Sequence, residues 1–266
     1  MMTPNMTDMQ GKTALVVGAG PGIGRACALA FAEAGADVVV AARRQEPLEA
    51  LAAELAERSG RRIEPVAADL SDLGSCVALA DAATERLGGI DALVTVATAG
   101  GGQVAVDDAD WDMWRRAFEV NVIGTFEISR LAARSMAARG GGSIVHVSTF
   151  GTHALPPKQA AYTSTKQAAM TASLTLAKEL GPAGIRVNVV TPGYTTGDNL
   201  DALFQSVADR TGESPDVVSQ RFARTAALRQ HVDPEDIAAA VLFLSSDASR
   251  RITGVEIPVT GGQHPL

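Results

Sequence analysis

Several residue types are scarce in this chain of 266 residues, and each scarcity excludes a class of protein. Its two cysteines, Cys27 and Cys76, are too few for a disulfide framework, and we expect them as buried thiols in a reducing cytoplasm. Four scattered histidines form no ligand cluster, so no metal is expected. Acidic residues outnumber basic ones, and the formal net charge of −7 argues against a nucleic-acid or anionic-membrane surface.

Long apolar runs are also missing. No stretch is long enough to span a bilayer, and residues 1–10 are polar and lack the apolar segment of a secretory signal. We expect these ten residues to fray as an N-terminal tail. The composition of the whole chain, 46% hydrophobic and 20% charged residues, is typical of a soluble globular protein. The length suits one α/β domain over residues 1–266, with no linker dividing it.

Short apolar runs alternate with helical segments along the chain. Strands that are apolar on both faces and separated by helices form parallel sheets with helices on either side. The fold class is therefore predicted as α/β, a three-layer doubly wound fold with a seven-stranded parallel sheet. Strands are expected at residues 12–17, 37–42, 61–67, 91–96, 141–147, 184–190 and 255–259, and helices at 25–34, 47–59, 73–87, 111–140, 162–178 and 234–245.

A glycine cluster separates the first strand from the first helix. Glycines at such a junction permit a tight turn and let the backbone approach a pyrophosphate, which the helix N-terminus then faces. The spacing of Gly18, Gly22 and Gly24 differs from the commonest dinucleotide fingerprint, and a merely tight turn is the alternative. We expect cofactor binding by Gly18, Gly20, Pro21, Gly22, Ile23 and Gly24.

The end of the second strand indicates which dinucleotide is bound. An acidic residue there would bind a ribose 2′-hydroxyl, but the chain has Arg43 and Arg44, and arginine accommodates a 2′-phosphate. NADP(H) is therefore favoured, and NAD(H) remains possible if both arginines are merely solvated. Asp69, after the third strand, is expected either to bind the adenine amine or to cap the next helix.

Tyr162 and Lys166 are spaced by one helical turn, which places them on the same helix face. A nearby ammonium favours the phenolate, so the pKa of the tyrosine is expected to fall from ~10 toward neutrality. Such a phenol can exchange a proton with a carbonyl or an alcohol. Taken alone, this spacing arises often by chance.

The combination of these motifs resembles the short-chain dehydrogenase/reductase family, the single-domain Rossmann branch, from about Lys12 to Gly262. The resemblance implies that Tyr162 is the general acid/base, that Lys166 lowers its pKa and binds the nicotinamide ribose, and that Asn121 holds a relay water. It also implies a hydroxyl that steadies the substrate oxygen, either Ser148 or Thr149. Further cofactor contacts are implied for Leu70, Ala97, Pro192, Gly193 and Thr195, with Thr196 as the alternative to Thr195.

The chain departs from the family pattern in places. The family's Asn-Asn-Ala-Gly run after the fourth strand is here Thr95-Val96-Ala97-Thr98, which changes a wall of the cofactor site. His146 replaces a frequent asparagine and is expected as a satisfied core histidine.

These features predict an NADP(H)-dependent oxidoreductase that interconverts a ketone or aldehyde with a small-molecule alcohol. An NAD(H)-dependent alcohol or diol dehydrogenase is the alternative, and a catalytically weak dinucleotide-binding sensor is the alternative of another class. The resemblance implies a homotetramer or homodimer, and a substrate lid over residues 195–230, with Leu203, Phe204, Val207 and Phe222 either lining the substrate or anchoring the lid.

Overall fold

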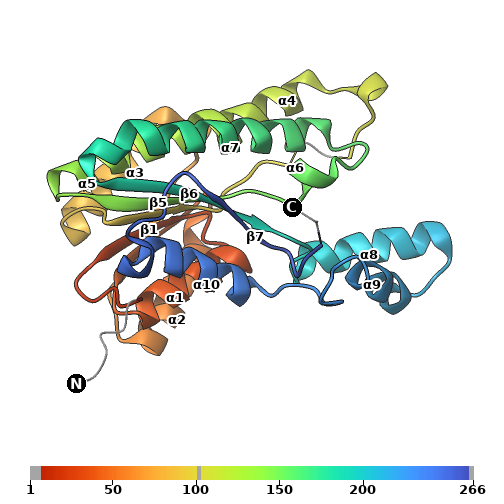
Figure 1. Cartoon of the computed structure of the whole chain (residues 1–266), viewed down its shortest axis with the longest axis horizontal. Coiled ribbons are helices and arrows are strands. Elements are labelled where there is room, and N and C mark those ends of the chain that lie inside the picture. Colours follow the sequence, from red (N-terminus) through yellow and green to blue (C-terminus); the bar gives the residue numbers. More distant parts are fainter. Residues whose placement is uncertain (1–6, 101–102, 264–266) are drawn as a thin grey trace.

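In the computed structural model, residues 7–100 and 103–263 are described. Their seven strands are all parallel and lie in the order β3-β2-β1-β4-β5-β6-β7 (Figure 1). The sheet confirms the predicted fold class. The strands are β1 (Thr13–Val17), β2 (Asp37–Ala42), β3 (Ile63–Ala67), β4 (Ala92–Thr95), β5 (Gly142–Val147), β6 (Ile185–Pro192) and β7 (Glu256–Val259).

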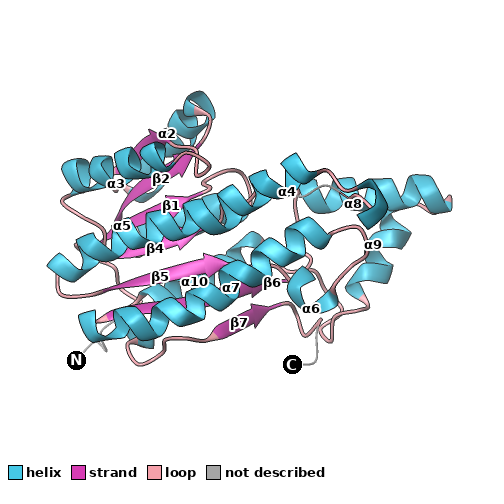
Figure 2. Ribbon diagram, turned by 90° about the horizontal axis from the view of Figure 1, so that it is seen from above, coloured by secondary structure: helices cyan, strands magenta, loops and turns pink. Residues whose placement is uncertain are grey.

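Helices cover both faces of the sheet. Helices α1, α2 and α10 lie on one face and α3, α4, α5 and α7 on the other (Figures 1 and 2). The α-helices are α1 (Ile23–Glu33), α2 (Gln45–Ser59), α3 (Leu73–Leu87), α4 (Trp111–Phe118), α5 (Thr125–Ala138), α6 (Gly151–Ala154), α7 (Ala160–Leu180), α8 (Asp198–Thr211), α9 (Pro215–Ala223) and α10 (Pro234–Ser245). Short helical turns are η1 (Val106–Asp108), η2 (Glu119–Gly124), η3 (Gly181–Ala183) and η4 (Asp247–Ser249).

Two apolar cores lie on either side of the sheet. One joins α1, α2 and α10 to the strands and includes Phe31 and Val40. The other lies under α3, α5 and α7 and includes Leu93 and Ile128. The strand order reverses between β1 and β4, and in open parallel sheets ligands bind at the carboxyl ends of the strands at such a switch point. A ligand crevice is therefore expected where the loops after β1 and β4 meet.

The predicted limits of α3 and α10 are confirmed, because both helices are capped locally. Asp72 precedes α3 and accepts a hydrogen bond from the Gly74 N–H at 2.8 Å, and Gly88 ends it in the left-handed conformation. Asp233 opens α10 in a capping box with Asp236.

Other boundaries are wrong in the sequence prediction. The single helix expected over residues 111–140 is three segments, since the π-helical η2 interrupts it. The sixth strand does not break at Thr191 but runs through Pro192, which pairs with Val259 at the sheet end, where the missing N–H of proline costs little. The helix that carries Tyr162 starts earlier, at Ala160, and the short helix α6 was not expected.

The chain ends and the segment after β6 complete the fold. Residues 1–6 of the expected tail, and residues 101–102 of the glycine run at 100–102, lie outside the described residues. Met9 is buried and its N–H bonds the Ala34 carbonyl at 2.8 Å, so the end of the expected tail is fixed. Within the described ranges, no helix combines the length and apolar character needed to cross a membrane.

Helices α8 and α9 form a lobe beyond the carboxyl end of β7 (Figure 1). The lobe has an apolar cluster of its own, in which Phe204 and Val207 are buried and Leu203 and Phe222 pack against them. These four residues therefore hold the two helices together.

Candidate active site

Three segments of the chain converge on the phenol of Tyr162. The residue lies in the first turn of α7 and is half-buried. The hydroxyls of Thr149, just after β5, and Thr98, just after β4, lie near enough to the phenol to lower the pKa of Tyr162. The tyrosine is thus held at the carboxyl edge of the sheet, beside the switch point.

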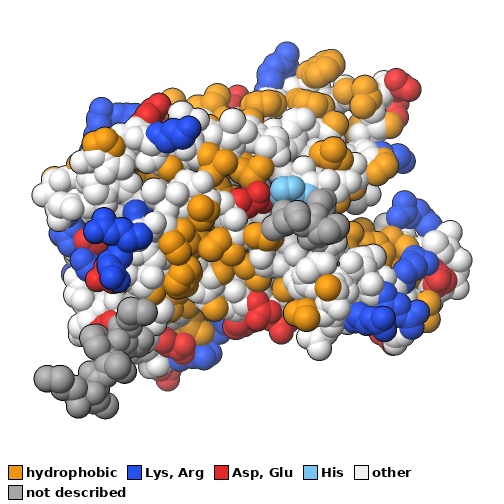
Figure 3. Space-filling view, in the orientation of Figure 1, with side chains coloured by type: hydrophobic (Ala, Val, Ile, Leu, Met, Phe, Trp, Pro, Cys, Tyr) orange, Lys and Arg blue, Asp and Glu red, His pale blue; other side chains and the backbone are white. Residues whose placement is uncertain are grey.

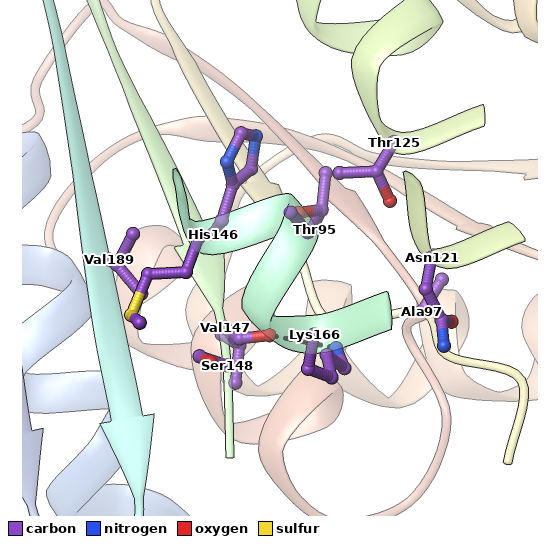
Figure 4. A pocket seen from close by; sticks show the side chains of 11 residues that line it. Thr95, Ala97, Asn121, Thr125, His146, Val147, Ser148, Lys166 and Val189 are labelled. Carbon is purple, nitrogen blue, oxygen red and sulfur yellow. Dashed lines mark hydrogen bonds between the residues drawn. The ribbon is translucent and has the colours of Figure 1, made fainter. Parts of the chain in front are cut away.

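Lys166 follows one turn later and is 6% exposed. Its Nζ donates to the Val147 carbonyl at 2.9 Å (Figure 4), and burial lowers the pKa of Lys166 to about 8. Burial also raises the pKa of Tyr162, and its hydrogen bonds to Thr149 and Thr98 offset only part of that rise. The expected lowering of the tyrosine pKa by the lysine is therefore wrong for this structure, because desolvation outweighs every favourable contact.

The two candidate hydroxyls after β5 have different surroundings. Thr149 Oγ1 accepts the Gly151 N–H at 3.2 Å, which leaves its own proton for the phenol of Tyr162. Ser148 Oγ is buried and has no hydrogen-bond partner among the described residues. It lines a small cavity of about 10 Å³ together with Lys166 and Asn121 (Figure 4), which is room for roughly one water molecule.

Asn121 lies in η2 and is 2% exposed. Its Oδ1 accepts hydrogen bonds from the Ala99 N–H at 2.7 Å and from Thr98 Oγ1 at 3.1 Å. Its Nδ2 donates to the Ala99 carbonyl and to Thr165 Oγ1, both at 2.9 Å. The amide therefore ties the loop after β4 to α7, directly behind Tyr162.

The glycine loop fits a pyrophosphate. A Cβ added at Gly18 would lie 2.2 Å from the Ala97 nitrogen, and one at Gly24 would lie 2.1 Å from the Gly18 carbonyl, so both glycines allow close packing. An added Cβ at Gly20 or Gly22 would meet nothing within 4 Å, which leaves open space above the loop. The N-cap of α1 is Gly22, which makes no side-chain hydrogen bond to the first-turn amides, so the N-terminus of the helix is available to an anion.

The loops after β2 and β3 carry the other predicted cofactor residues. Arg43 and Arg44 are exposed, and neither forms a salt bridge within the described residues. Asp69 does not cap α3, since Asp72 does. Its carboxylate instead accepts two hydrogen bonds from Ser71, which are the main reason that the pKa of Asp69 is lowered.

The remaining predicted residues lie on the same edge of the sheet. The Leu70 carbonyl closely approaches Gly124, where an added Cβ would be 1.9 Å away. Pro192 ends β6, and the Gly193 N–H bonds the Val259 carbonyl at 2.9 Å. Thr195 Oγ1 bonds the Gly193 carbonyl at 3.2 Å.

Comparison with known proteins decides the family. A family model described as enoyl-(acyl carrier protein) reductase matches residues 18–264, nearly the whole chain. The chain belongs to the short-chain dehydrogenase/reductase family. As a member of that family, it is an NAD(P)-dependent oxidoreductase that acts on CH–OH groups.

Named relatives of this short-chain dehydrogenase/reductase match over the full length. It is 37% identical over 260 residues to carbonyl reductase [NADPH] 2 of Sus scrofa, covering 96% of this chain and 97% of the relative. It is 33% identical over 254 residues to 7alpha-hydroxysteroid dehydrogenase of Escherichia coli strain K12, covering 96% and 94%. L-sorbose reductase from Gluconobacter frateurii, solved with NADPH and L-sorbose, superposes with a TM-score of 0.92 at 29% identity, covering 98% and 99%.

Two contacts in this dehydrogenase/reductase site were missed from the sequence. Thr98 reaches both Tyr162 and Asn121, and Thr165 bonds Asn121. The role of Thr98 could have been suspected from the sequence, because this threonine stands where the family has glycine. Nothing in the sequence singled out Thr165, since a threonine inside a helix is most often structural.

Proposed function

We propose that this enzyme is an NADP(H)-dependent dehydrogenase/reductase that interconverts a ketone or aldehyde and the corresponding alcohol, with Tyr162 as general acid/base. One observation carries the proposal: the phenol of Tyr162 lies near the Thr149 hydroxyl and one helical turn from the buried Lys166 ammonium, at the carboxyl edge of the sheet beside the crevice. A phenol and a second hydroxyl in contact are the groups that a reacting carbonyl oxygen needs.

The dinucleotide and the side chains of the protein have separate roles in the proposed reaction. The dinucleotide supplies or accepts the hydride when it is bound. During reduction Tyr162 donates its phenolic proton to the carbonyl oxygen, and during oxidation it takes the alcohol proton. Thr149 donates a hydrogen bond to the same oxygen, in preference to Ser148, whose Oγ is buried.

Lys166 and Asn121 hold the surroundings of the phenol. An ammonium has three N–H donors and the Val147 carbonyl takes one, so Lys166 keeps two for ribose hydroxyls. Asn121 fixes the loop after β4 through its amide, and the small cavity beside it has room for a relay water.

The preference for NADP(H) rests on Arg43 and Arg44, which are exposed at the end of β2 where an acidic residue would select NAD(H). Their guanidinium groups suit a 2′-phosphate. The glycine loop from Gly18 to Gly24, with Ala97 against it, has the open space that a pyrophosphate requires. Leu70, Pro192, Gly193 and Thr195 complete the proposed cofactor wall.

The substrate is proposed to be a small molecule with apolar bulk, admitted under the lobe formed by α8 and α9. A row of three aromatic side chains links the site to that lobe. The ring centroids of Phe150 and Tyr194 are 6.3 Å apart, and those of Tyr194 and Phe222 are 4.9 Å apart. Relatives named for a steroid and for a sugar share this fold, so the lobe and not the sheet is expected to set selectivity.

Replacing the phenol tests the assignment. Tyr162→Phe should reduce kcat by about 10²–10⁴-fold, because it removes general acid/base catalysis, while the Kd for the dinucleotide changes little. The chain has only two tyrosines, so Tyr194→Phe is a matched control that should retain turnover. Rates are measured by nicotinamide absorbance over a panel of carbonyls and alcohols, with NADPH and NADH side by side.

The outcomes of that experiment distinguish between the proposed function and its alternatives. Full turnover in Tyr162→Phe would refute the acid/base role. Tight dinucleotide binding without turnover of any substrate in the panel would favour a sensor. A higher kcat/KM with NADH would overturn the NADP(H) assignment in favour of an NAD(H)-dependent alcohol dehydrogenase.

A further inference from the structure

Thr98 stands in an unusual position for its residue type. It lies just after β4, where the family's Asn-Asn-Ala-Gly run has its glycine, and it is exposed at the edge of the crevice. Its Oγ1 donates to Asn121 Oδ1 at 3.1 Å, and its hydroxyl also lies near enough to the phenol of Tyr162 to lower the pKa of that residue. A glycine could make neither contact, so this chain has a hydroxyl link between the phenol and the amide that the usual family residue cannot provide.

The amide at the far end of this link is rigid. Asn121 is buried, and its other three hydrogen bonds go to the Ala99 N–H, the Ala99 carbonyl and Thr165 Oγ1. Thr165 in turn donates to the Tyr162 carbonyl at 2.8 Å. Thr98 is therefore held between two groups whose own positions are fixed by α7 and η2.

One hydroxyl proton serves both charge states of the phenol. A threonine hydroxyl has one donor proton and two acceptor lone pairs. While Tyr162 is protonated, its O–H can donate to Thr98, which donates to Asn121 Oδ1. When Tyr162 is a phenolate, rotation of the Thr98 hydroxyl redirects that proton to the phenolate oxygen. Asn121 Oδ1 still accepts from the Ala99 N–H at 2.7 Å, so the rotation leaves no buried acceptor without a donor.

We propose that Thr98 is a positioning residue for Tyr162, and that its hydroxyl donates to the phenolate and accepts from the phenol as the tyrosine passes through its two states. This inference rests on the proposed acid/base role of Tyr162. It adds a second threonine to the one at position 149, so that hydroxyls from the loops after β4 and β5 both act on the phenol.

Charged groups on the surrounding elements do not replace this effect. For Tyr162, burial and the two threonines are the causes that govern its pKa, and none of them is an ion pair. Within α7 the nearest charge, Lys166, is directed at the Val147 carbonyl. The other titratable or charged side chains on elements that pack against α7 are His146 on β5, His153 on α6, Asp112, Arg115 and Arg116 on α4, Glu119 on η2, Glu127, Arg130 and Arg134 on α5, and Arg186 on β6.

The experiment reads the phenol directly. Since the chain has two tyrosines, tyrosinate ultraviolet absorbance in a Tyr194→Phe background reports Tyr162 alone. In that background Thr98→Val, which keeps the shape and removes the hydroxyl, should raise the titration midpoint by about one pH unit, the effect of one lost hydrogen bond to a charged group. Thr98→Ser, which restores the hydroxyl, should titrate near the parent.

Kinetics supply a second readout with the full enzyme. Thr98→Val should move the alkaline limb of the kcat profile for reduction to higher pH, lower kcat for oxidation by about tenfold at neutral pH, and leave KM for the dinucleotide unchanged. Thr98→Gly, which introduces the family residue, should behave like Thr98→Val. Thr98 is exposed, and thermal unfolding of each variant checks that the fold is kept.

The outcomes separate this inference from the proposed function. Equal midpoints for the valine, serine and parent proteins would overturn it, and so would equal shifts for valine and serine, since those indicate shape and not a hydroxyl. If Thr98→Val still shifts the rate profile in a Tyr162→Phe background, Thr98 does not act through the phenol. Full turnover in Tyr162→Phe would contradict the proposed function. The midpoints of the absorbance titrations would still decide whether Thr98 hydrogen-bonds the phenolate.

Discussion

His146 is a buried histidine in β5 with a partner at each ring nitrogen. Its Nε2 lies 2.9 Å from Ser129 Oγ, and its Nδ1 contacts Ser173 Oγ. Burial, with a smaller contribution from the Lys166 charge, lowers the pKa of His146 to about 3. The prediction of a satisfied core histidine is confirmed, and the imidazole is neutral at every pH at which the enzyme would work.

This burial makes stability depend on pH. The folded chain keeps His146 neutral down to about pH 3, whereas the unfolded chain protonates it near 6.5. Between these values the unfolded state binds one more proton, so the free energy of unfolding falls as the pH falls, by at most roughly 5 kcal/mol. His146→Asn, which places the frequent family residue there, should flatten this dependence in urea unfolding measured from pH 6.5 to 4. Parallel curves for the two proteins would contradict the assignment.

Side-chain contacts were the part of the site that sequence reasoning could not supply. The spacing of Tyr162 and Lys166 follows from helix geometry, and both lie where it predicts. The direction of the Lys166 ammonium does not, because it depends on a carbonyl of β5. The choice between Ser148 and Thr149 likewise depends on how the chain turns after that strand, and neighbouring residues there face opposite ways.

At the scale of the element, η2 is the segment that no local sequence pattern predicted. Its π-helical turn lies between α4 and α5 and carries Asn121. Such turns are frequent at functional sites. It ends at Gly124, where the Leu70 carbonyl comes so close that an added Cβ would be 1.9 Å away. The position of Asn121 therefore depends on a glycine that lets the loop after β3 approach.

Gly124→Ala should test this dependence. The added methyl group must push η2 away from the Leu70 backbone, and overpacking of this kind costs about 1–3 kcal/mol. We expect lower stability in urea unfolding and a lower kcat, because Asn121 moves with η2. Gly181→Ala is the matched control, since Gly181 has a helical conformation and nothing lies within 4 Å of an added Cβ. Equal stability of the two variants would count against the close contact.

Elements with local signals were predicted well, and those that depend on distant contacts were not. Capping aspartates and a terminal glycine mark the ends of α3 and α10 in the sequence itself. The break at η2 depends on contact with the loop after β3, and the extension of β6 through Pro192 depends on pairing with β7. Neither partner is adjacent in the chain.

At the scale of the whole molecule, small or apolar side chains are exposed along α7 and around β7. A groove of about 650 Å³ lies along α7 beside Phe126 of α5. Its lining includes Ala168 and Ala172 and also the polar Gln167 and Glu179. Hydrophobic side chains also gather around β7 and α10 on the face in Figure 3. Val255, directly before β7, is 36% exposed. The composition alone indicated neither surface.

We expect a homotetramer or homodimer in solution, measured by light scattering. Ala172→Arg should reduce the mass of the assembly, because a long charged side chain in the groove keeps two helix pairs apart. Ala53→Arg, the same change on the exposed side of α2, should leave the mass unaltered. A monomeric parent protein, or equal masses for both variants, would contradict this assembly.

The lobe of α8 and α9 has a consequence for how the enzyme can change. Its residues pack chiefly on one another, around Phe204 and Val218, and not within either core of the sheet. Sequence drift in that lobe is therefore expected to leave both cores of the sheet intact, and, since we propose that the lobe admits the substrate, to change selectivity without loss of stability. Grafting the equivalent helices of a relative onto this chain is accordingly the natural route to exchanging its selectivity.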